Sequence, residues 1–337
     1  MSPLPDPLVL DRLNALPQGL ADVSARDIRT VFPNSALIHL DGRRELAPLA
    51  LGVLLHGDET VGLTVLQRLQ AWMKRHPLPR PMIIFVGNVH AAEAGLRKLP
   101  GRADYNRVWS GGDSPEAALA QTVLAEVKRA EPFALIDLHN NTGANPHYAC
   151  VHNMRPDTLQ LASLFSRLAV RTLNPPTLFS IAMSGITPAI TAECGRPGEP
   201  TGEEAAFNMV LDALHLDHWR GAPDLDLQVF DVTGRIEIAP DARIAFEHGI
   251  EGDIELPAKL ESWNFFERPA GSTFARLLSK GEPLRVVDGA GADVTGRFFT
   301  EEGDRLILRR AATPAMLTVS EAAIRADCLG YLMEAAG

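Results

Sequence analysis

Three stretches in the first half of the chain are almost continuously apolar. They read LALGVLLHG at 49–57, MIIFVGNV at 82–89 and FALIDLHNN at 133–141. A strand with one face in water alternates apolar and polar residues, so continuous runs are typical of strands buried on both faces. These runs therefore predict a covered, largely parallel sheet, to which SALIHL at 35–40 adds a further strand.

Helical patterns separate the predicted strands, because apolar residues recur there at the spacing of one helix face. The clearest pattern, 114–131, has Ser114 as the expected N-cap and Glu116 in its first turn. The other helical stretches are 59–76, 156–171 and 201–219. Strands that alternate with helices in this way predict a domain of the α/β class.

The pattern changes after residue 222. VFDVTGRIEIA, PLRVVDG and RLILRRA are short, alternate in character and are separated by Gly and Asp turns, which is typical of β structure. We therefore predict two domains, an α/β domain over 1–222 and a smaller β-rich domain over 223–337. The second domain could cover a site on the first.

The charge balance narrows the class of partner. Among 337 residues, Lys plus Arg number 32 and Asp plus Glu number 42, which gives a net charge of −10. The sequence contains no dense Lys/Arg run, so we expect neither a nucleic-acid nor an anionic-membrane surface, and small molecules or peptides are the better fit. The amino-terminal stretch does not resemble a signal peptide, and no apolar run approaches the roughly 20 residues of a membrane span. We therefore expect a cytoplasmic protein.

Cysteine usage limits the kind of metal site. Cys150, Cys194 and Cys328 are the three cysteines, and they are too few and too scattered for a disulfide framework or a cysteine-based zinc site. Any metal must therefore be held by His and carboxylate side chains.

Polar side chains follow three of the predicted strands, where open α/β sheets collect their ligands. They are His56 and Glu59, Asn88 and His90, and Asp137, His139 and Asn140. His56, Glu59 and His139 fit a zinc site of two His and one carboxylate that keeps one position open for water, as hydrolytic zinc sites do. Asp137 precedes His139 by two residues, so it would point to the same side of a strand and could bind the outer ring nitrogen.

The spacing alone does not single out one pair. HAAE at 90–93 repeats the His-x-x-Glu pattern of HGDE at 56–59, and it also follows an apolar run. Either pair could equally be a helix start with a Glu favoured by the helix dipole beside an unrelated His.

Two loops add further candidates. GRADYNRVW at 101–109 places Asn106 beside Arg107, and an amide next to a guanidinium fork suits a carboxylate. ITAECGRPGEP at 190–200 places Glu193 at the end of a strand-like run, as a general base for a water molecule requires. A solvated salt bridge remains the alternative for Arg107, and an ordinary loop-entry residue the alternative for Glu193.

Four motifs together resemble the succinylglutamate desuccinylase/aspartoacylase family, within the zinc carboxypeptidase-like group. HGDET is similar to its first metal motif, DYNR to its D-L-N-R loop, DLHNNTG to its D-L-H segment and TAECG to its E-x-G segment. The order and rough spacing agree over 51–200, and WNFFERPAGSTFARL at 263–277 resembles part of the family's carboxy-terminal β domain.

The resemblance implies a fold and a metal site. The fold would be a zinc-carboxypeptidase-like mixed sheet, largely parallel and flanked by helices, followed by a smaller β-rich domain. One Zn²⁺ per chain would be held by His56, Glu59 and His139 in the catalytic domain. HAAE would then belong to the connection after the next strand.

The resemblance also implies an activity. The protein would be a zinc-dependent hydrolase of carbon–nitrogen amide bonds that removes an acyl group from an N-acyl amino acid or a similar small amide. Glu193 would move the proton between water and the leaving amine. A further Arg, either Arg97 or Arg102, would steady the carbonyl oxygen. Substrate contacts would come from Asn106, Arg107 and Asn140.

Departures from the family bear on the substrate. Tyr105 stands where the family more often has a small aliphatic residue, which leaves Asn106 and Arg107 in register. The stretch 178–193 lacks the additional Arg of aspartoacylase-like enzymes, which argues against N-acetylaspartate. We expect Cys194 to pack rather than to react.

Two alternatives stay open beside the deacylase. A zinc metallocarboxypeptidase acting on peptides would keep the same metal site but need an open cleft. A non-catalytic binder of an acidic metabolite or protein would not need an intact set of His56, Glu59, His139 and Glu193. The sequence leaves the oligomeric state open.

Overall fold

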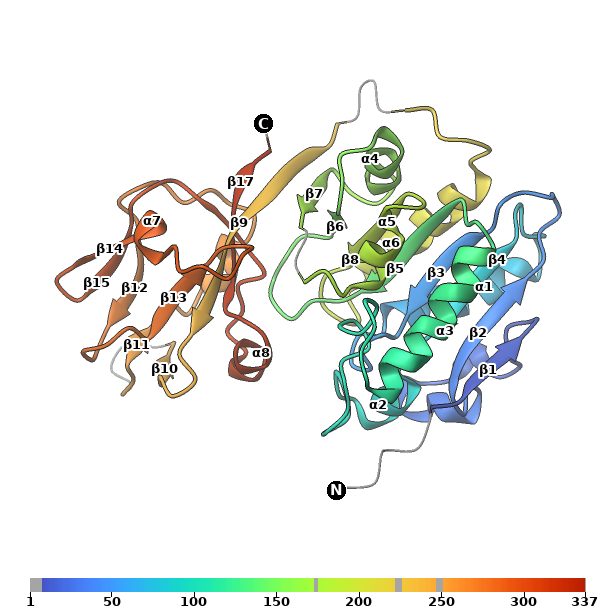
Figure 1. The fold of residues 1–337 in the computed structure, drawn as a ribbon, viewed down its shortest axis with the longest axis horizontal. Coiled ribbons are helices and arrows are strands. Elements are labelled where there is room, and N and C mark those ends of the chain that lie inside the picture. The colour runs from blue at the N-terminus through green and yellow to red at the C-terminus, as the bar shows by residue number, and fades with distance from the viewer. Residues whose placement is uncertain (1–7, 173–174, 222–225, 247–250, 337) are drawn as a thin grey trace. The chain divides into compact units, whose positions relative to one another are not determined.

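The computed structural model describes residues 8–172, 175–221, 226–246 and 251–336 (Figure 1). The chain forms two compact units. The first unit contains Met1–Asn140 and His147–Leu227, and the second contains Asn141–Pro146 and Gln228–Gly337. The predicted boundary between residues 222 and 223 lies outside the described residues.

The first unit is built on one sheet with the strand order β1-β2-β4-β3-β5-β8-β6-β7. Its strands are β1 (Leu10–Leu13), β2 (Ser35–Leu40), β3 (Leu49–Val53), β4 (Met82–Val86), β5 (Ala134–His139), β6 (Tyr148–Val151), β7 (Leu168–Arg171) and β8 (Ala189–Glu193). The pairs β2/β4 and β6/β8 are antiparallel, and the other neighbouring pairs in this order are parallel. The prediction of a largely parallel, covered sheet is therefore confirmed.

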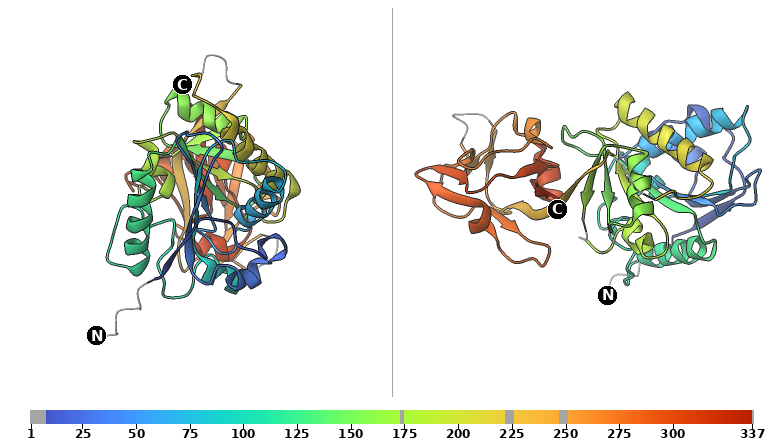
Figure 2. Two further views of the ribbon diagram at one scale, coloured as in Figure 1. Left: turned by 90° about the vertical axis from the view of Figure 1, so that its right-hand side faces the viewer. Right: turned by 90° about the horizontal axis from the view of Figure 1, so that it is seen from above.

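Helices cover both faces of this sheet (Figure 2). Helix α1 packs with α6 over one face, while α3 lies over the other face in a core that includes Phe85 and Leu135. The helices are α1 (Val61–Met73), α2 (Val89–Ala94), α3 (Pro115–Arg129), α4 (Pro156–Ser163), α5 (Phe179–Ser184) and α6 (Pro200–His215), with short 3-10 turns η1 (Leu20–Asp22) and η2 (Ala25–Thr30). The Ser114 hydroxyl accepts a hydrogen bond from Ala117 N–H, so the predicted N-cap of α3 is confirmed.

One predicted helix is only partly correct. The pattern at 156–171 predicted a single helix, but α4 ends at Ser163 and the residues from Leu168 form β7. The strand pairs in parallel with β6, and its central residues Ala169 and Val170 are buried. Tertiary pairing at this edge of the sheet outweighs the local helical spacing.

Strands β3, β5 and β8 are parallel neighbours, so their carboxyl ends meet at one edge of the sheet. His139 and Glu193 are the last residues of β5 and β8, and His56 follows β3 after a tight turn. In that turn Leu54 has a φ of 54°, a left-handed backbone that a branched residue rarely adopts. The topology thus gathers polar side chains from three separate parts of the sequence.

The second unit is rich in strands, as predicted. β9 (Gln228–Ile238) pairs with β13 (Leu284–Val287) and β17 (Gly330–Ala335), and β17 also pairs with β16 (Thr313–Ala315). A second sheet contains β10 (Ile244–Ala245), β11 (Ile254–Glu255), β12 (Thr273–Leu277), β15 (Arg305–Leu308) and β14 (Phe299–Glu302), accompanied by η3 (Leu260–Trp263), α7 (Thr295–Phe298) and α8 (Glu321–Ala326).

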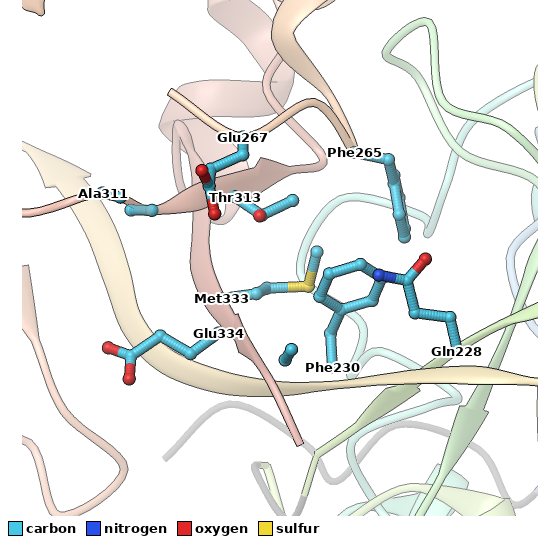
Figure 3. A pocket seen from close by; sticks show the side chains of 10 residues that line it. Gln228, Phe230, Phe265, Glu267, Ala311, Thr313, Met333 and Glu334 are labelled. Carbon is cyan, nitrogen blue, oxygen red and sulfur yellow. The ribbon is translucent and has the colours of Figure 1, made fainter. Parts of the chain in front are cut away.

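The second unit has its own core and a small pocket. The core is formed around Phe274, Phe298 and Leu332. A pocket of about 240 Å³ opens beside Phe230 and Met333 (Figure 3). That this unit covers the active site stays a prediction. Within the described residues, no helix has the length and apolar character to cross a membrane.

The start of α6 passes very close to the residue after Glu193. A Cβ atom on Gly202 would overlap the Cys194 carbonyl oxygen. We expect Gly202→Ala to lower the free energy of unfolding by about 1–3 kcal/mol, because α6 must move away from the end of β8 to make room for the methyl group. Urea unfolding followed by circular dichroism measures this loss.

Gly185→Ala is the matched control. Gly185 is the C-cap of α5 with a φ of −82°, and no heavy atom lies within 4 Å of the position that an alanine methyl group would take there. We expect the control to stay within roughly 0.5 kcal/mol of the wild type. Equal losses for the two variants would contradict the close approach at Gly202.

Candidate metal centre

His56, Glu59 and His139 meet at the carboxyl edge of the first unit's sheet. Glu59 lies between the two rings, with Oε1 at 2.7 Å from His56 Nδ1 and Oε2 at 2.7 Å from His139 Nδ1. The backbone N–H of Asn140 also donates to Glu59 Oε2, at 3.1 Å. The three predicted side chains thus lie together, with the Glu59 carboxylate between the two His rings.

Both rings turn their outer nitrogen toward a second carboxylate. His56 Nε2 lies 3.1 Å from Asp104 Oδ1, and His139 Nε2 lies 3.0 Å from Asp137 Oδ2. Asp137 occupies the position expected from its spacing to His139, and Gly52 makes room for it, since a Cβ there would lie 2.6 Å from Asp137 Oδ1. Carboxylates placed in this way fix the ring orientation and leave Nδ1 for a metal.

The charges of the cluster depend on one another. Burial alone would raise the pKa of Glu59, but the neighbouring His56 and His139 hold that pKa well below its ordinary value. Burial opposes protonation of His139, but the Asp137 and Glu59 carboxylates raise the pKa of the ring overall. The arrangement therefore concentrates negative charge around the two imidazoles, and their protonation compensates for it.

The residues present fit a divalent metal ion. The candidate ligand atoms of His56, Glu59 and His139 all lie within 4.8 Å of one another. Among the described residues, these three side chains form the cluster of His, Cys, Asp or Glu that could hold a metal ion. Two imidazole nitrogens and a carboxylate are a donor set that zinc accepts, and three protein ligands leave a coordination position free.

Glu193 lies next to this cluster. It is the register partner of His139 in the neighbouring strand, so both side chains lie on the same face of the sheet. Its Oε2 atom is buried and has no hydrogen-bond partner among the described residues. Burial raises the pKa of Glu193 to about 7, which suits a group that must both accept and release a proton near neutral pH.

The structure separates the two arginines that the sequence left equivalent. Arg97 Nε donates to Asp104 Oδ2 at 3.1 Å, and its Nη1 lies 3.5 Å from Glu59 Oε1, within the cluster. Arg102 instead donates from Nε to the buried carboxylate of Glu116 at 2.6 Å. Of the two guanidinium groups, that of Arg97 is therefore the one in contact with a candidate metal ligand.

The DYNR loop contacts both His rings. The Asp104 carboxylate accepts from Asn106 N–H at 2.7 Å in addition to its contacts with His56 and Arg97. The Asn106 amide is buried, with Nδ2 at 3.2 Å from His139 Nε2 and Oδ1 accepting from Phe179 N–H at 3.2 Å. The structure thus places Asn106 beside a candidate ligand.

Arg107 and Tyr105 differ in exposure. Arg107 is half-buried, and its Nη1 donates to the Asn106 carbonyl at 3.0 Å. Tyr105 is buried, with its hydroxyl 3.5 Å from Ser35 Oγ. The aromatic residue that departs from the family pattern therefore anchors the loop to β2.

Several other candidates are engaged in structural contacts. The Asn140 amide accepts from Val61 N–H at 3.0 Å and donates to the Gly195 carbonyl at 2.9 Å, which ties β5 to the start of α1. His90 and Glu93 lie in α2, where Glu93 pairs with Arg29 near the surface. The duplicated HAAE pattern thus belongs to a short helix.

Cys194 packs, as expected. The thiol is buried, and burial raises its pKa well above the ordinary value, so the sulfur stays protonated.

The site residue that the sequence analysis did not predict is Asp104, whose carboxylate contacts His56. Burial opposes its ionisation, but the hydrogen bond with His56 and the charges of His56, Arg97 and Arg107 hold the pKa of Asp104 well below its ordinary value. Its 48-residue separation from His56 gives no local pattern. The only signal in the sequence was its place in the DYNR motif.

Comparisons with known proteins agree with the motifs. The model of the succinylglutamate desuccinylase/aspartoacylase catalytic domain matches residues 49–199. A search of curated proteins gives no match.

Solved structures show a similar fold. Succinylglutamate desuccinylase from Chromobacterium violaceum has a TM-score of 0.57 at 16% identity, covering 87% of this chain and 86% of that one. Murine aminoacylase 3 has a TM-score of 0.56 at 17% identity, covering 88% and 97%. The product-bound ectoine utilization protein EutE from Ruegeria pomeroyi has a TM-score of 0.53 at 17% identity, covering 88% of each chain. At these identities the likeness shows the fold alone.

The geometry predicts which substitutions weaken metal binding. We expect His139→Ala to remove most of the metal measured per chain by elemental mass spectrometry. Asp104→Asn keeps the side-chain size but removes the charge beside His56, so we expect metal affinity to fall by roughly 10- to 100-fold in a chelator competition.

His90→Ala is the control, since this histidine has the same spacing to a glutamate but lies in α2. We expect its metal content to equal that of the wild type. Metal content that His139→Ala leaves unchanged, or that His90→Ala reduces equally, would contradict the assignment of the ligands.

Proposed function

Because the chain carries the catalytic domain of the succinylglutamate desuccinylase/aspartoacylase family, we propose that it is a zinc-dependent amidohydrolase. Its reaction is removal of an acyl group from an N-acyl amino acid or a similar small amide. The observation that carries this proposal is the position of Glu193 beside His56, Glu59 and His139 at one edge of the sheet. A binder without catalysis would not need a buried, unpaired carboxylate there.

His56, Glu59 and His139 would hold the zinc ion. When bound, zinc supplies Lewis acidity, which lowers the pKa of water toward neutral and polarises a carbonyl group. Asp104 and Asp137 keep the two rings in position for it through their outer nitrogens.

Glu193 acts as the general base and acid. Its carboxylate accepts a proton from the attacking water and returns that proton to the nitrogen of the leaving amine. A pKa raised to about 7 leaves the group close to balance between its two protonation states at neutral pH. The free Oε2 atom gives water a hydrogen-bond acceptor that no described protein group occupies.

The two arginines of this region have separate roles. Arg97, held by Asp104 and next to Glu59, stabilises the negative charge that develops on the carbonyl oxygen. Arg107 is half-buried and binds the substrate carboxylate, so that the amide is oriented toward Glu193. The net charge of −10 means that these local guanidinium groups, rather than the overall field, attract an anionic substrate.

The general base is tested by Glu193→Gln. This variant keeps the side-chain size and the hydrogen-bonding shape but cannot accept the proton, so we expect kcat to fall by roughly 10²- to 10⁴-fold with metal content unchanged. Hydrolysis is measured on a panel of N-acyl amino acids and short peptides, which also separates a deacylase from a carboxypeptidase.

Glu199→Gln is the matched control, because Glu199 is in the loop that follows Glu193 and ahead of α6. We expect its kcat to stay within about twofold of the wild type. If the wild-type protein binds metal but hydrolyses no member of the panel, the proposal that it is an amidohydrolase is refuted.

The choice between the two arginines is tested in parallel. We expect Arg97→Gln to lower kcat/KM by roughly 10²- to 10³-fold. Arg102→Gln leaves the buried Glu116 without its partner, so we expect a lower melting temperature and a smaller change in kcat/KM. The reverse pattern would assign the oxyanion role to Arg102.

A further inference from the structure

The pocket of the second unit lies on one face of the sheet that β9, β17 and β16 form (Figure 3). Side chains alternate between the two faces of a strand, and register partners in neighbouring strands lie on the same face. Ala335 is the partner of Phe230, and Met333 is the partner of Thr313, so these four side chains share a face. The small Ala335 side chain between larger neighbours leaves part of the 240 Å³ hollow.

Two aromatic rings and a thioether form the apolar part of the pocket. The ring centroids of Phe230 and Phe265 are 6.0 Å apart, with the rings nearly perpendicular, and Met333 is fully buried beside them. Phe265 has a φ of 62°, and its backbone N–H donates to the Pro314 carbonyl at 2.7 Å. A bulky residue held in this left-handed conformation is strained, and such strain is concentrated at functional sites.

The other side of the pocket is polar. Figure 3 shows the oxygen atoms of Glu267 and Thr313 on the side away from the Phe265 ring. The Thr313 side chain is only 7% exposed, and its hydroxyl makes no hydrogen bond within the part of the chain that the structure describes. Buried hydroxyl groups in native proteins are nearly always paired, so this one calls for a partner outside the chain.

Glu267 gives the pocket its charge. Among the described residues, its carboxylate has neither a hydrogen bond nor an ion pair. The second carboxylate at the rim, that of Glu334, lies 2.9 Å from Arg310 Nη2, and Figure 3 shows it turned away from the pocket. The charge that a ligand meets beside the apolar wall is therefore the negative charge of Glu267.

An ammonium group on a short apolar body matches both sides of the pocket. Its N–H groups can donate to the Glu267 carboxylate and the Thr313 hydroxyl, while the apolar body lies against the two rings and Met333. An anion would be repelled by Glu267, and an apolar molecule would leave the Thr313 hydroxyl unpaired. The volume restricts the ligand to a small molecule.

We propose that the second unit binds a small organic amine in its protonated form, in the pocket lined by Phe230, Phe265, Met333, Glu267 and Thr313. The proposal does not depend on the metal centre of the first unit or on the proposed function. Its test therefore measures binding and not hydrolysis.

The test uses benzylamine as the probe and the Met333 methyl group as the reporter. The full chain is labelled with ¹³C at the methyl groups of its eight methionines, and Met333→Leu assigns the Met333 resonance. At neutral pH we expect benzylamine to shift this resonance in a saturable way, with a dissociation constant of about 0.1–10 mM. A resonance that does not move up to about 50 mM benzylamine would overturn the proposal.

The charge is tested with a neutral probe and a matched pair of variants. Benzyl alcohol has the same ring without the ammonium group, so we expect it to bind about tenfold more weakly than benzylamine. Glu267→Gln should weaken benzylamine binding by a similar factor of about 10, because the ion pair is lost. The control is Glu301→Gln, on an exposed residue of β14 outside the pocket, which should leave the dissociation constant within about twofold. Equal affinities for amine and alcohol, or equal effects of the two variants, would overturn the assignment.

The hydroxyl contact is tested by Thr313→Val. The variant keeps the side-chain size and breaks no hydrogen bond of the described chain, so the melting temperature should not fall. Benzylamine affinity should fall by about three- to tenfold, because the ammonium group loses one acceptor. An unchanged dissociation constant, or a melting temperature that falls in parallel with affinity, would give Thr313 no part in ligand binding and overturn the proposed site.

Discussion

The structure of the site depends on the burial of one carboxylate, that of Glu59. A carboxylate removed from water is strongly destabilising unless charges and hydrogen bonds replace its hydration. Two imidazoles at 2.7 Å and the Asn140 N–H at 3.1 Å provide that replacement from two separate segments, one at His56 and one at His139 and Asn140. The positions of β3, β5 and the loop after β5 are therefore linked through a single side chain, and the same charges suit a cation.

Further charged side chains surround the Glu59 carboxylate and its two His rings. Asp104 and Asp137 each contact the outer nitrogen of one His ring, and Arg97 bridges Asp104 and Glu59. Because each charged group is held by one of opposite sign, the cluster has little freedom to rearrange. Glu193 lies beside this cluster with its Oε2 atom lacking a hydrogen-bond partner in the described chain, and burial raises its pKa to about 7. The group assigned to proton transfer is thus a buried carboxylate with one oxygen open to water.

Sequence patterns predicted the parts of the molecule that follow local rules. Apolar runs predicted β3, β4 and β5, and polar residues at their ends predicted His56, Glu59 and His139 as a group. Local sequence patterns did not predict features that depend on contacts between residues far apart in the sequence. The stretch from Leu168 became β7 because it pairs with β6, and Asp104 reaches His56 only through the fold. The choice between Arg97 and Arg102 depended on the buried Glu116, which occupies Arg102.

The hexapeptide Asn141–Pro146 belongs to the second unit, although the residues on both sides of it belong to the first. Ala144 N–H donates to Glu261, and Gly143 lies so close to the Leu317 carbonyl that a Cβ there would overlap the oxygen. A single cut near residue 227 would leave this loop in one fragment and the residues that receive it in the other. The two units are consequently not interchangeable modules, and recombination that exchanged one of them would have to preserve a matching loop in the other.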